Sequence, residues 1–331
     1  MEQIIIDKID KMILAELDRN SRQPNSLIAR KLRISRERVD YRIMQLLRKG
    51  VINKFPTIIN PTKFGYSMFK LYFQFQNLTI EKEKSIISWL VENPYVQWVT
   101  SCKGRWDMNV IVFAHDAEHF SKIMQEFYNK YGEWIFSQNL NISLAVGNME
   151  KGWILKEKEH YSNIIYTANE REDLDLDQTD LELLKIIANN ARMSTVDIAR
   201  EMKTTPKIVT YSIKQLEKKQ VIKGYTVSLN YTELRKQFYK VIFYISIMDE
   251  RLRSRLIEYC RTRNNMPYFI FCIGEWPFEV EYVVDDINEF YAAVEDVKAR
   301  FPEIKRYESI LLAKEHKFDY IPLCYEPRVR E

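Results

Sequence analysis

Residues 28–52 read IARKLRISRERVDYRIMQLLRKGVI, and residues 198–222 read IAREMKTTPKIVTYSIKQLEKKQVI. Each stretch contains a short apolar helical pattern, a brief turn, and a longer helical pattern that starts at a residue suited to helix capping, Ser35 or Thr205. Pro206 follows Thr205 at the first helical position, where its missing N–H group is not needed. The sequence therefore predicts a helix-turn-helix in both stretches.

Both stretches belong to one long internal repeat. When the sequence is shifted by 170 residues, the distance from Asp10 to Asp180, it aligns with itself without a gap for more than sixty positions. Other matched pairs are Leu14 and Leu184, Arg22 and Arg192, Ile43 and Ile213, and Asn60 and Asn230. The register returns further on, where residues 102–106 align with residues 272–276. Two long copies exclude a solenoid and indicate a duplicated two-domain unit.

The remainder of each unit shows the order strand-helix-strand-strand-helix-strand. The expected elements are residues 68–76, 80–92, 96–103, 108–114, 117–131 and 140–146 in the first unit, and residues 238–247, 251–263, 268–273, 278–284, 287–300 and 304–312 in the second. This order is that of a ferredoxin-like split β-α-β domain. The predicted fold class is α+β, with two winged helix-turn-helix domains, each followed by a ferredoxin-like βαββαβ domain.

The domain limits follow from these patterns. We place helix-turn-helix domains at residues 1–60 and 175–230, and ferredoxin-like regulatory domains at residues 61–155 and 231–320. Residues 156–174 are charged and polar and are predicted to form a linker, in which Ile164-Ile165-Tyr166 could dock on a domain. Residues 321–331 are assigned to a C-terminal tail. The alternating segments Val51–Phe55 and Val221–Tyr225 predict a strand or wing that leads out of each helix-turn-helix module.

The composition is that of a folded cytoplasmic protein. The chain has 331 residues, of which 46% are hydrophobic, and only 8 glycines, which argues against disorder. No apolar run reaches the roughly 18 residues of a membrane span, and the first residues lack the features of a secretory signal. The four cysteines are far apart, so we expect reduced, buried thiols and a cytoplasmic location.

Positive charge is concentrated in the helix-turn-helix segments. Residues 1–60 carry 13 Lys and Arg against 7 Asp and Glu, and residues 175–230 carry 9 against 7. Residues 61–155 balance at 9 against 9, and residues 231–320 are acidic at 14 against 16. A local excess of this kind, without a wide apolar face, favours a polyanion such as double-stranded DNA over a membrane as the partner.

Several short motifs accompany this order of elements. They are Ile6-Asp7-x-x-Asp10-x-x-Ile13-Leu14, Arg22, Ser35-Arg36, Arg42-Ile43-x-x-Leu46-x-x-x-Gly50-Val51-Ile52, Gly224-Tyr225-Thr226, Leu229-Asn230 and the turn Gly104–Asp107. Together they resemble the Lrp/AsnC (leucine-responsive, feast/famine) family of transcription regulators, once per unit over nearly the whole chain. The second unit departs where Pro277 aligns with Asp107 and Gln220 with Gly50. Family members usually carry one unit per chain, so the tandem duplication is a further departure.

A helix-turn-helix protein places the second helix of the motif in the major groove of DNA. The candidate DNA-binding residues are therefore Ser35, Arg36, Arg38 and Tyr41 in the first unit, and Thr205, Lys207, Thr210, Tyr211 and Lys214 in the second. The arginines can hydrogen-bond guanine edges or phosphates. The alternatives are a solvated helix face for the charged residues and a packing role for the two tyrosines. Arg42, which lies nearer the core, is a candidate to hold a carboxylate such as Asp10 instead.

The resemblance implies that the regulatory domains pair through their sheets, here within one chain as an intramolecular pseudo-dimer that could assemble further. It also implies an amino acid or similar small effector near the central hairpin turns, with Gly104, Asp107 and Gly274 as the candidate effector-binding residues. The alternative for both glycines is a tight β-turn that needs no ligand. Trp106 and Trp276 are expected to be packing residues.

No constellation of residues points to catalysis, a cofactor or a metal. The histidines His115, His119, His160 and His316 are scattered, and no nucleophile triad, carboxylate pair or phosphate-binding loop is present. Sirohaem decarboxylases share the two-domain architecture, but their histidine-bearing motif falls on residues 99–103 and 270–273, which contain no histidine. An enzyme of that kind, and an architectural protein that binds DNA without sequence preference, are the alternatives to a sequence-specific, non-enzymatic regulator.

Overall fold

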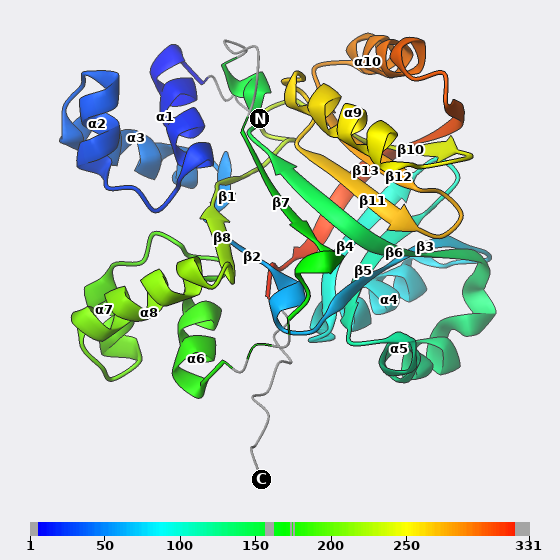
Figure 1. Cartoon of the computed structure of the whole chain (residues 1–331), viewed down its shortest axis with the longest axis horizontal. Helices are drawn as coiled ribbons and strands as arrows, with labels where there is room; N and C mark the ends of the chain where they lie inside the picture. Colours follow the sequence, from blue (N-terminus) through cyan, green and yellow to red (C-terminus); the bar gives the residue numbers. More distant parts are fainter. Residues whose placement is uncertain (1–5, 156–161, 173, 175, 322–331) are drawn as a thin grey trace.

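The computed structural model describes residues 6–155, 162–172, 174 and 176–321 of the chain. Two helical modules lie next to a strongly curved sheet that carries further helices on its outside (Figure 1). The first module consists of α1 (Lys8–Arg19), α2 (Asn25–Leu32) and α3 (Arg36–Arg48), and the second of α6 (Gln178–Ile187), α7 (Thr195–Glu201) and α8 (Pro206–Lys218).

Local capping explains where these helices begin. Asp7 and Asp10 form a reciprocal capping box at the start of α1. The Ser35 hydroxyl accepts a hydrogen bond from the N–H of Arg38 at 3.2 Å, and the Thr205 hydroxyl caps α8 in the same way. The buried faces of α3 and α8 consist of Val39, Ile43 and Leu46, and of Val209, Ile213 and Leu216. The two predicted helix-turn-helix folds are therefore confirmed.

The remaining elements form the two ferredoxin-like domains in the predicted order. The first contains β3 (Ser67–Phe75), α4 (Ile80–Glu92), β4 (Val96–Lys103), β5 (Met108–Ala114), α5 (Ala117–Tyr131) and β6 (Ile135–Met149). The second contains β10 (Gln237–Ile245), α9 (Glu250–Arg261), β11 (Tyr268–Ile273), β12 (Phe278–Val284), α10 (Ile287–Arg300) and β13 (Ile304–Phe318). The last strand of each domain is longer than the sequence indicated. β6 begins earlier, where it pairs with β3 of its own domain, and β13 ends later, where it pairs with β4 of the first domain.

The two sheets join through their edges. β13 pairs with β4 of the first domain, and β6 pairs with β11 of the second, so the nine-stranded sheet closes on itself with β7 (Asn163–Thr167) added outside the circle. The result is a barrel with its helices on the outer surface (Figure 1). Instead of two sheets that only face each other, the two domains share backbone hydrogen bonds, which also cover the strand edges. Residues 163–167 of the predicted linker thus form a strand.

Strand residues alternate between the helix-covered outside and the inside of the barrel. Leu71 of β3 packs in the core beneath α4 and α5, whereas its neighbour Lys70 points inward and reaches the second domain. Trp106 and Trp276 are 1% and 0% exposed, and their rings pack inside the barrel with centroids 6.5 Å apart. This burial confirms the predicted packing role of both tryptophans.

A buried group of charges joins the two domains inside the barrel. Lys70 and Lys240 occupy matching positions of the repeat, and both are 0% exposed. Glu279 forms an ion pair with Lys70, lies 3.5 Å from Lys240 Nζ, and accepts a hydrogen bond from Trp276 Nε1 at 2.8 Å. Lys240 Nζ also lies 3.2 Å from Glu281. Burial alone would raise the pKa of Glu279, but the ammonium groups of Lys70 and Lys240 lower this pKa to about 2.

The strands that leave the helix-turn-helix modules are exchanged between the two units. β1 (Ile52–Lys54) pairs with β9 (Ser228–Leu229), and β2 (Thr57–Ile59) pairs with β8 (Ile222–Tyr225). Each exit segment therefore pairs with the exit segment of the other copy and not, in the described residues, with a strand of its own module. Alternation predicted the strands correctly but not their partners, since a period of two residues says which face is buried and nothing about which strand lies alongside.

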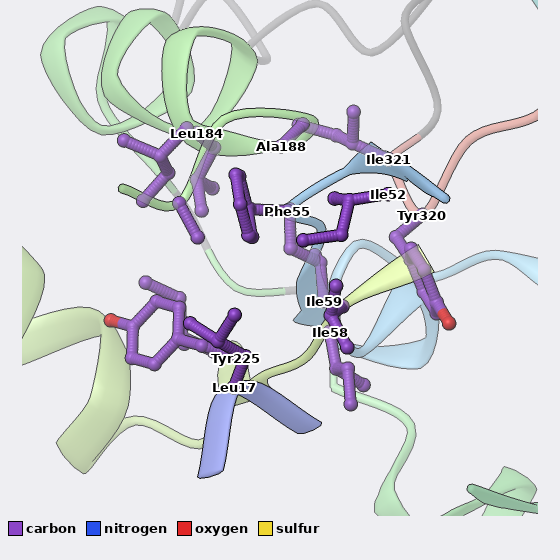
Figure 2. Packing of buried hydrophobic residues seen from close by; sticks show 14 of the residues in the cluster. Leu17, Ile52, Phe55, Ile58, Ile59, Leu184, Ala188, Tyr225, Tyr320 and Ile321 are labelled. Atoms are coloured by element: carbon purple, nitrogen blue, oxygen red, sulfur yellow. The ribbon is translucent and has the colours of Figure 1, made fainter. Parts of the chain in front are cut away.

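Side chains reinforce this exchange. Phe55 of the first exit segment lies beside Ala188 of the second module, and Tyr225 of the second exit segment lies beside Leu17 of the first module (Figure 2). The backbone N–H of Ala191 donates to the carbonyl of Phe55 at 2.8 Å. The two helix-turn-helix modules therefore share one continuous hydrophobic core.

Three further expectations concern membrane, thiols and metal. No helix in the described ranges has the length and apolar character needed to cross a membrane. Cys102, Cys260 and Cys272 are free and buried as expected, and Cys324 lies outside the described residues. Among the residues whose positions the structure gives, no group of three or more His, Cys, Asp or Glu side chains could hold a metal ion.

Replacing Phe55 with alanine should lower the free energy of unfolding by about 3–5 kcal/mol, because a buried ring is lost and a cavity remains. Since the ring packs on the second module, hydrogen exchange should accelerate in α6 as well as in β1. Denaturant unfolding and hydrogen–deuterium exchange measure the two effects. Phe136, which is 65% exposed, is the matched control, and F136A should change the free energy by less than about 0.5 kcal/mol. Faster exchange confined to the first module would contradict the shared core.

A Glu279→Gln variant should lower the free energy of unfolding by about 3–5 kcal/mol at neutral pH, because the buried ammonium group of Lys70 loses its carboxylate and that of Lys240 keeps only Glu281. The pKa of Glu279 is about 2 in the folded protein and about 4.3 in an unfolded chain, so its contribution is complete above the higher value and is lost as the pH falls toward the lower one. Acid unfolding of the variant should therefore depend less steeply on pH in this window. The control E308Q changes a carboxylate that pairs with Arg105 and should keep the wild-type profile. Identical profiles for E279Q and the wild type would refute this role.

Candidate nucleic-acid interface

The predicted DNA-binding residues form one exposed set on each recognition helix, α3 and α8. They are Ser35, Arg36, Arg38 and Tyr41, and Thr205, Lys207, Thr210, Tyr211 and Lys214, and every one of them is exposed to solvent. All but Lys214, which lies in the third turn of α8, come from the N-cap and the first two turns of each helix. This is the part that a helix-turn-helix presents to base edges. The structure thus gathers each set on a surface that could meet a duplex.

The arginines of α3 differ in what they contact. Arg36 lies 3.5 Å from a carboxylate one turn further on, in a pair that is exposed at both ends, and Arg38 is exposed as well. Arg42 lies 2.7 Å from Asp7 and 3.1 Å from Asp10, at the start of α1. The backbone N–H of Asp10, and then the Arg42 guanidinium, lower the pKa of the Asp7 carboxyl. Arg42 therefore joins α3 to α1, as the sequence predicted, whereas Arg36 and Arg38 face solvent.

The second recognition helix offers different chemistry. Lys207 and Lys214 present exposed amines, and Ile208 adds an apolar side chain that is 46% exposed. The Thr210 hydroxyl donates to the carbonyl of Pro206 at 2.8 Å, which leaves its oxygen lone pairs as acceptors. No arginine of α8 stands where α3 carries Arg36 and Arg38.

Two tyrosines occupy matching places on the recognition helices. Tyr41 is 59% exposed and Tyr211 is 64% exposed, so the structure does not support the alternative of a packing role. A tyrosine hydroxyl can donate to a phosphate oxygen. Met44, which is 46% exposed, adds an apolar group on the same helix as Tyr41.

The first recognition helix is also tied to the other module, which the sequence did not reveal. Arg192 of the second module donates to Asn25 Oδ1 at 2.5 Å, and the Asn25 amide donates to Asp40 on α3. Arg22, the matching residue of the first module, donates to the carbonyl of Ala191. The matching of Arg22 and Arg192 in the repeat was the available signal, but it did not indicate that each reaches into the opposite module.

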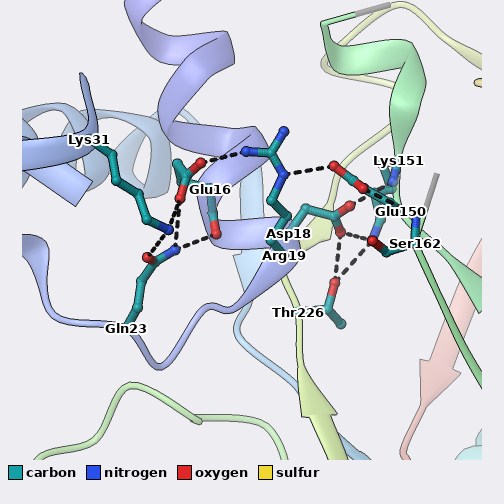
Figure 3. Close-up of polar contacts among 9 residues, drawn as sticks. All are labelled: Glu16, Asp18, Arg19, Gln23, Lys31, Glu150, Lys151, Ser162 and Thr226. Atoms are coloured by element: carbon teal, nitrogen blue, oxygen red, sulfur yellow. Dashed lines mark hydrogen bonds and ion pairs between the residues drawn. The ribbon is translucent and has the colours of Figure 1, made fainter. Parts of the chain in front are cut away.

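A polar network fixes the first module to the barrel (Figure 3). Asp18 at the end of α1 is 8% exposed, and its carboxylate accepts from Lys151 Nζ at 2.6 Å and from the Thr226 hydroxyl at 2.8 Å. Arg19 donates to Glu150 at 2.8 Å. Glu150 and Lys151 directly follow β6, and Thr226 lies between β8 and β9. The network therefore joins α1 both to the barrel and to the second exit segment.

Two of the predicted effector-binding residues lie in hairpin turns at the far end of the barrel from the modules. Gly104 follows β4 with a φ of +134°, and Gly274 follows β11 with a φ of +154°. A Cβ atom at Gly274 would lie 1.5 Å from Asn141 Oδ1 of the other domain, so the close approach of the two domains itself requires glycine there. The tight-turn alternative thus accounts for both glycines without a ligand.

Asp107, the third of these residues, has a local partner. Its carboxylate accepts from the N–H of Phe75 at 2.8 Å. Arg105 of the first turn lies 3.9 Å from Glu275 of the second. The structure therefore brings the two turns close together.

A cavity of about 760 Å³ lies between the other end of the barrel and the exit segments. Its walls combine inward-facing barrel residues with Asn53 and Pro56 of the first exit segment and residues 226–230 of the second. Among the described residues, no histidine or arginine lines it. Gly104, Asp107 and Gly274 do not line it either, and no pattern in the sequence indicated this space.

Comparison with known proteins gives matches to both halves of the chain. A family model described as "Winged helix-turn-helix DNA-binding" matches residues 6–53 and 176–223. The chain is 36% identical over 126 residues to an uncharacterized HTH-type transcriptional regulator of Pyrococcus furiosus. The aligned region covers 37% of this chain and 82% of that protein. It is 32% identical over 129 residues to the HTH-type transcriptional regulator LrpA of Pyrococcus horikoshii, covering 39% of this chain and 88% of LrpA.

The comparison with solved structures also gives matches over the whole tandem arrangement. The siroheme decarboxylase NirDL aligns with a TM-score of 0.61 over 94% of this chain and 93% of its own, at 11% sequence identity. At this identity the likeness shows a shared fold alone.

Replacing Arg42 with alanine should lower the free energy of unfolding by about 1–3 kcal/mol, because the buried carboxylate of Asp10 loses its guanidinium partner. Replacing Arg36 or Arg38 should change this free energy by less than about 0.5 kcal/mol, since both side chains are exposed. Denaturant unfolding of the three single variants makes the comparison. Equal losses in all three would show that Arg42 has no special role between α1 and α3.

Proposed function

We propose that this chain, a member of the Lrp/AsnC family of helix-turn-helix transcription regulators, binds an asymmetric operator through two different recognition helices. The chain is a tandem duplication of the family's two-domain unit. It is a double-stranded DNA-binding regulator of transcription. The observation that carries the proposal is that α3 and α8 are both exposed, rest on one shared core, and present different side chains.

The two helices differ at nearly every position that could meet a base. Arg36 aligns with Pro206, Glu37 with Lys207, Arg38 with Ile208, and Asp40 with Thr210. Arginine suits the paired acceptors of guanine, whereas lysine, threonine and an apolar side chain present other donors and contacts to the groove. Two surfaces that differ this much favour two dissimilar half-sites.

Phosphate contacts would hold both helices in place. The N-cap residues Ser35 and Thr205, with Tyr41 and Tyr211, are the proposed groups, because helix N-termini and hydroxyls donate to phosphate oxygens. The net charge of +6 on residues 1–60, from 13 basic and 7 acidic side chains, supports this assignment.

The proposal includes a chain that acts as its own dimer. The pairing of β13 with β4 and of β6 with β11 supports it, since it supplies within one chain the contacts that two chains would otherwise provide. Further assembly of such pseudo-dimers belongs to the same proposal. Light scattering distinguishes a single chain from an assembly of several.

A small amino-acid-like effector is proposed to act at the hairpin turns that hold Gly104, Asp107 and Gly274. The support is that Arg105 and Glu275 bring the two turns together at one end of the barrel, where exposed backbone and charge are available to a zwitterion. Titration of amino acids against an Asp107→Asn variant tests this assignment.

The enzymatic alternative is less well supported. NirDL is named as a siroheme decarboxylase, and the fold it shares with this chain is the argument in favour. Against it, no histidine or arginine lines the large cavity among the described residues. Histidine is the residue on which the resemblance to such enzymes depends, and arginine is the residue that suits the carboxylates of a tetrapyrrole. A Soret band in the purified protein would favour the enzyme. A selection from random DNA that yields no preferred sequence would favour an architectural DNA-binding protein.

Selection of binding sites from random DNA should yield two dissimilar half-sites about 34 Å apart, one helical turn between centres. Arg38→Ala should relax the sequence preference of one half-site and Lys207→Ala that of the other, each at a cost of about 1–3 kcal/mol in binding free energy. Lys122→Ala, which removes an exposed charge on α5 far from both helices, is the control and should leave the selected sequence unchanged. A palindromic site, together with no effect of K207A, would reduce the second module to a structural role.

A further inference from the structure

The cavity at the mouth of the barrel has the dimensions of a small-molecule site. Its volume of about 760 Å³ falls within the roughly 300–1,000 Å³ that is usual for ligand pockets. Much of its wall is aromatic, from Trp98, Tyr166, Tyr231, Phe238, Tyr268, Phe318 and Tyr320. Because aromatic rings pack well against other flat rings, a wall of this kind favours a planar aromatic ligand.

Three buried polar atoms in the wall lack a hydrogen-bond partner among the described residues. They are Gln97 Oε1, Ser143 Oγ and Asn148 Nδ2, and their residues are 3%, 5% and 7% exposed. Buried polar groups in folded proteins are nearly always hydrogen-bonded, so their presence here needs an explanation. Since all three residues line one cavity, a ligand with both donor and acceptor groups would satisfy them together.

The charges of the wall are unevenly satisfied. Lys70, Lys151, Lys236 and Lys240 each form an ion pair with a carboxylate. Glu315 differs: its carboxylate accepts from Trp98 Nε1 at 2.9 Å, and no described Lys, Arg or His lies within 4.0 Å of it. Four of the five wall amines are thus engaged, and the fifth, Lys314, is exposed to solvent, whereas the carboxylate of Glu315 is available to a cation beside the ring of Trp98.

From these features we infer that the cavity binds a small planar aromatic molecule that carries an amino group, with the amine at Glu315 and the ring between the aromatic walls. The wall also includes Asn53, Pro56 and residues 226–230, which belong to the exit segments that fix both recognition helices. A ligand that contacts both the barrel and the exit segments binds most tightly to one relative position of these two parts. Ligand binding in the cavity therefore changes the position of the recognition helices and with it the affinity for DNA. This regulatory part rests on the proposed function.

Calorimetric titration of the full chain tests the site without DNA. Tryptamine and tyramine are the probes, and indole-3-propionate and 3-(4-hydroxyphenyl)propionate are their matched controls, with the same rings and the opposite charge. The amines should bind and the acids should bind at least about tenfold more weakly. Glu315→Gln should weaken amine binding by about tenfold or more, since a charge-assisted hydrogen bond is lost. Glu308→Gln, on the same strand but outside the cavity wall, should bind as the wild type does.

A second variant guards against misfolding of the first. Val146 lines the cavity, and Val146→Trp should fill it and abolish amine binding while circular dichroism and thermal unfolding show a folded protein. No binding of either amine at millimolar concentration would overturn the proposal. Equal binding of acids and amines, or wild-type binding by a folded E315Q, would do so as well.

A gel-shift titration with and without saturating tryptamine then tests regulation. The apparent Kd for the selected operator should change by about fivefold or more in the wild type and stay unchanged in E315Q. Amine binding without any change in Kd would overturn the regulatory part and leave the site intact. A protein that binds the amine but selects no operator would count against the proposed function and not against the cavity.

Discussion

The exchange of exit strands between the two units is the contact on which the rest of the molecule depends. Because β1 pairs with β9 and β2 with β8, neither helix-turn-helix module completes its core alone. The same pairing places the exit segments over the mouth of the barrel, where they form one wall of the large cavity. The relative position of the two recognition helices is therefore set by backbone hydrogen bonds and a shared core, not by the length of a flexible linker.

The charges inside the barrel favour the pairing of one unit with the other over the pairing of two identical units. Lys70 and Lys240 match in the repeat, but Asn109 of the first domain aligns with Glu279 of the second, and Ile111 aligns with Glu281. Two first domains would bury two lysines without these carboxylates, and two second domains would bury four carboxylates against two lysines. Since an unpaired buried charge is strongly destabilising, the mixed barrel is the arrangement in which the charges are satisfied.

Local features of this fold could be predicted from the sequence, and contacts between distant segments could not. Ser35 and Thr205 mark helix starts because capping is decided within a few residues, and Val39 and Val209 fall on buried faces because helical period determines the face. Contacts between segments more than 150 residues apart could not be predicted, because the alternation of apolar and polar residues describes only local structure. Examples are the pairing of β1 with β9, the hydrogen bond from Arg192 to Asn25 and the ion pair of Lys70 with Glu279. The cavity was missed for the same reason, since its wall is assembled from nearly the whole length of the chain.

The recognition helices are exposed at matching positions, which allows their separation to be measured directly. Arg48 on α3 and Lys218 on α8 are both exposed, align in the repeat and lie outside the proposed DNA-binding sets. Nitroxide labels can therefore be attached to cysteines at these two sites in a variant without native cysteines. Pulsed electron–electron double resonance should give one narrow distribution of distances between the two labels in the free protein, and the same distribution when the selected operator is bound. A broad or two-peaked distribution in the free protein would contradict the account, because it would mean that the exchanged strands do not hold the two modules as one unit.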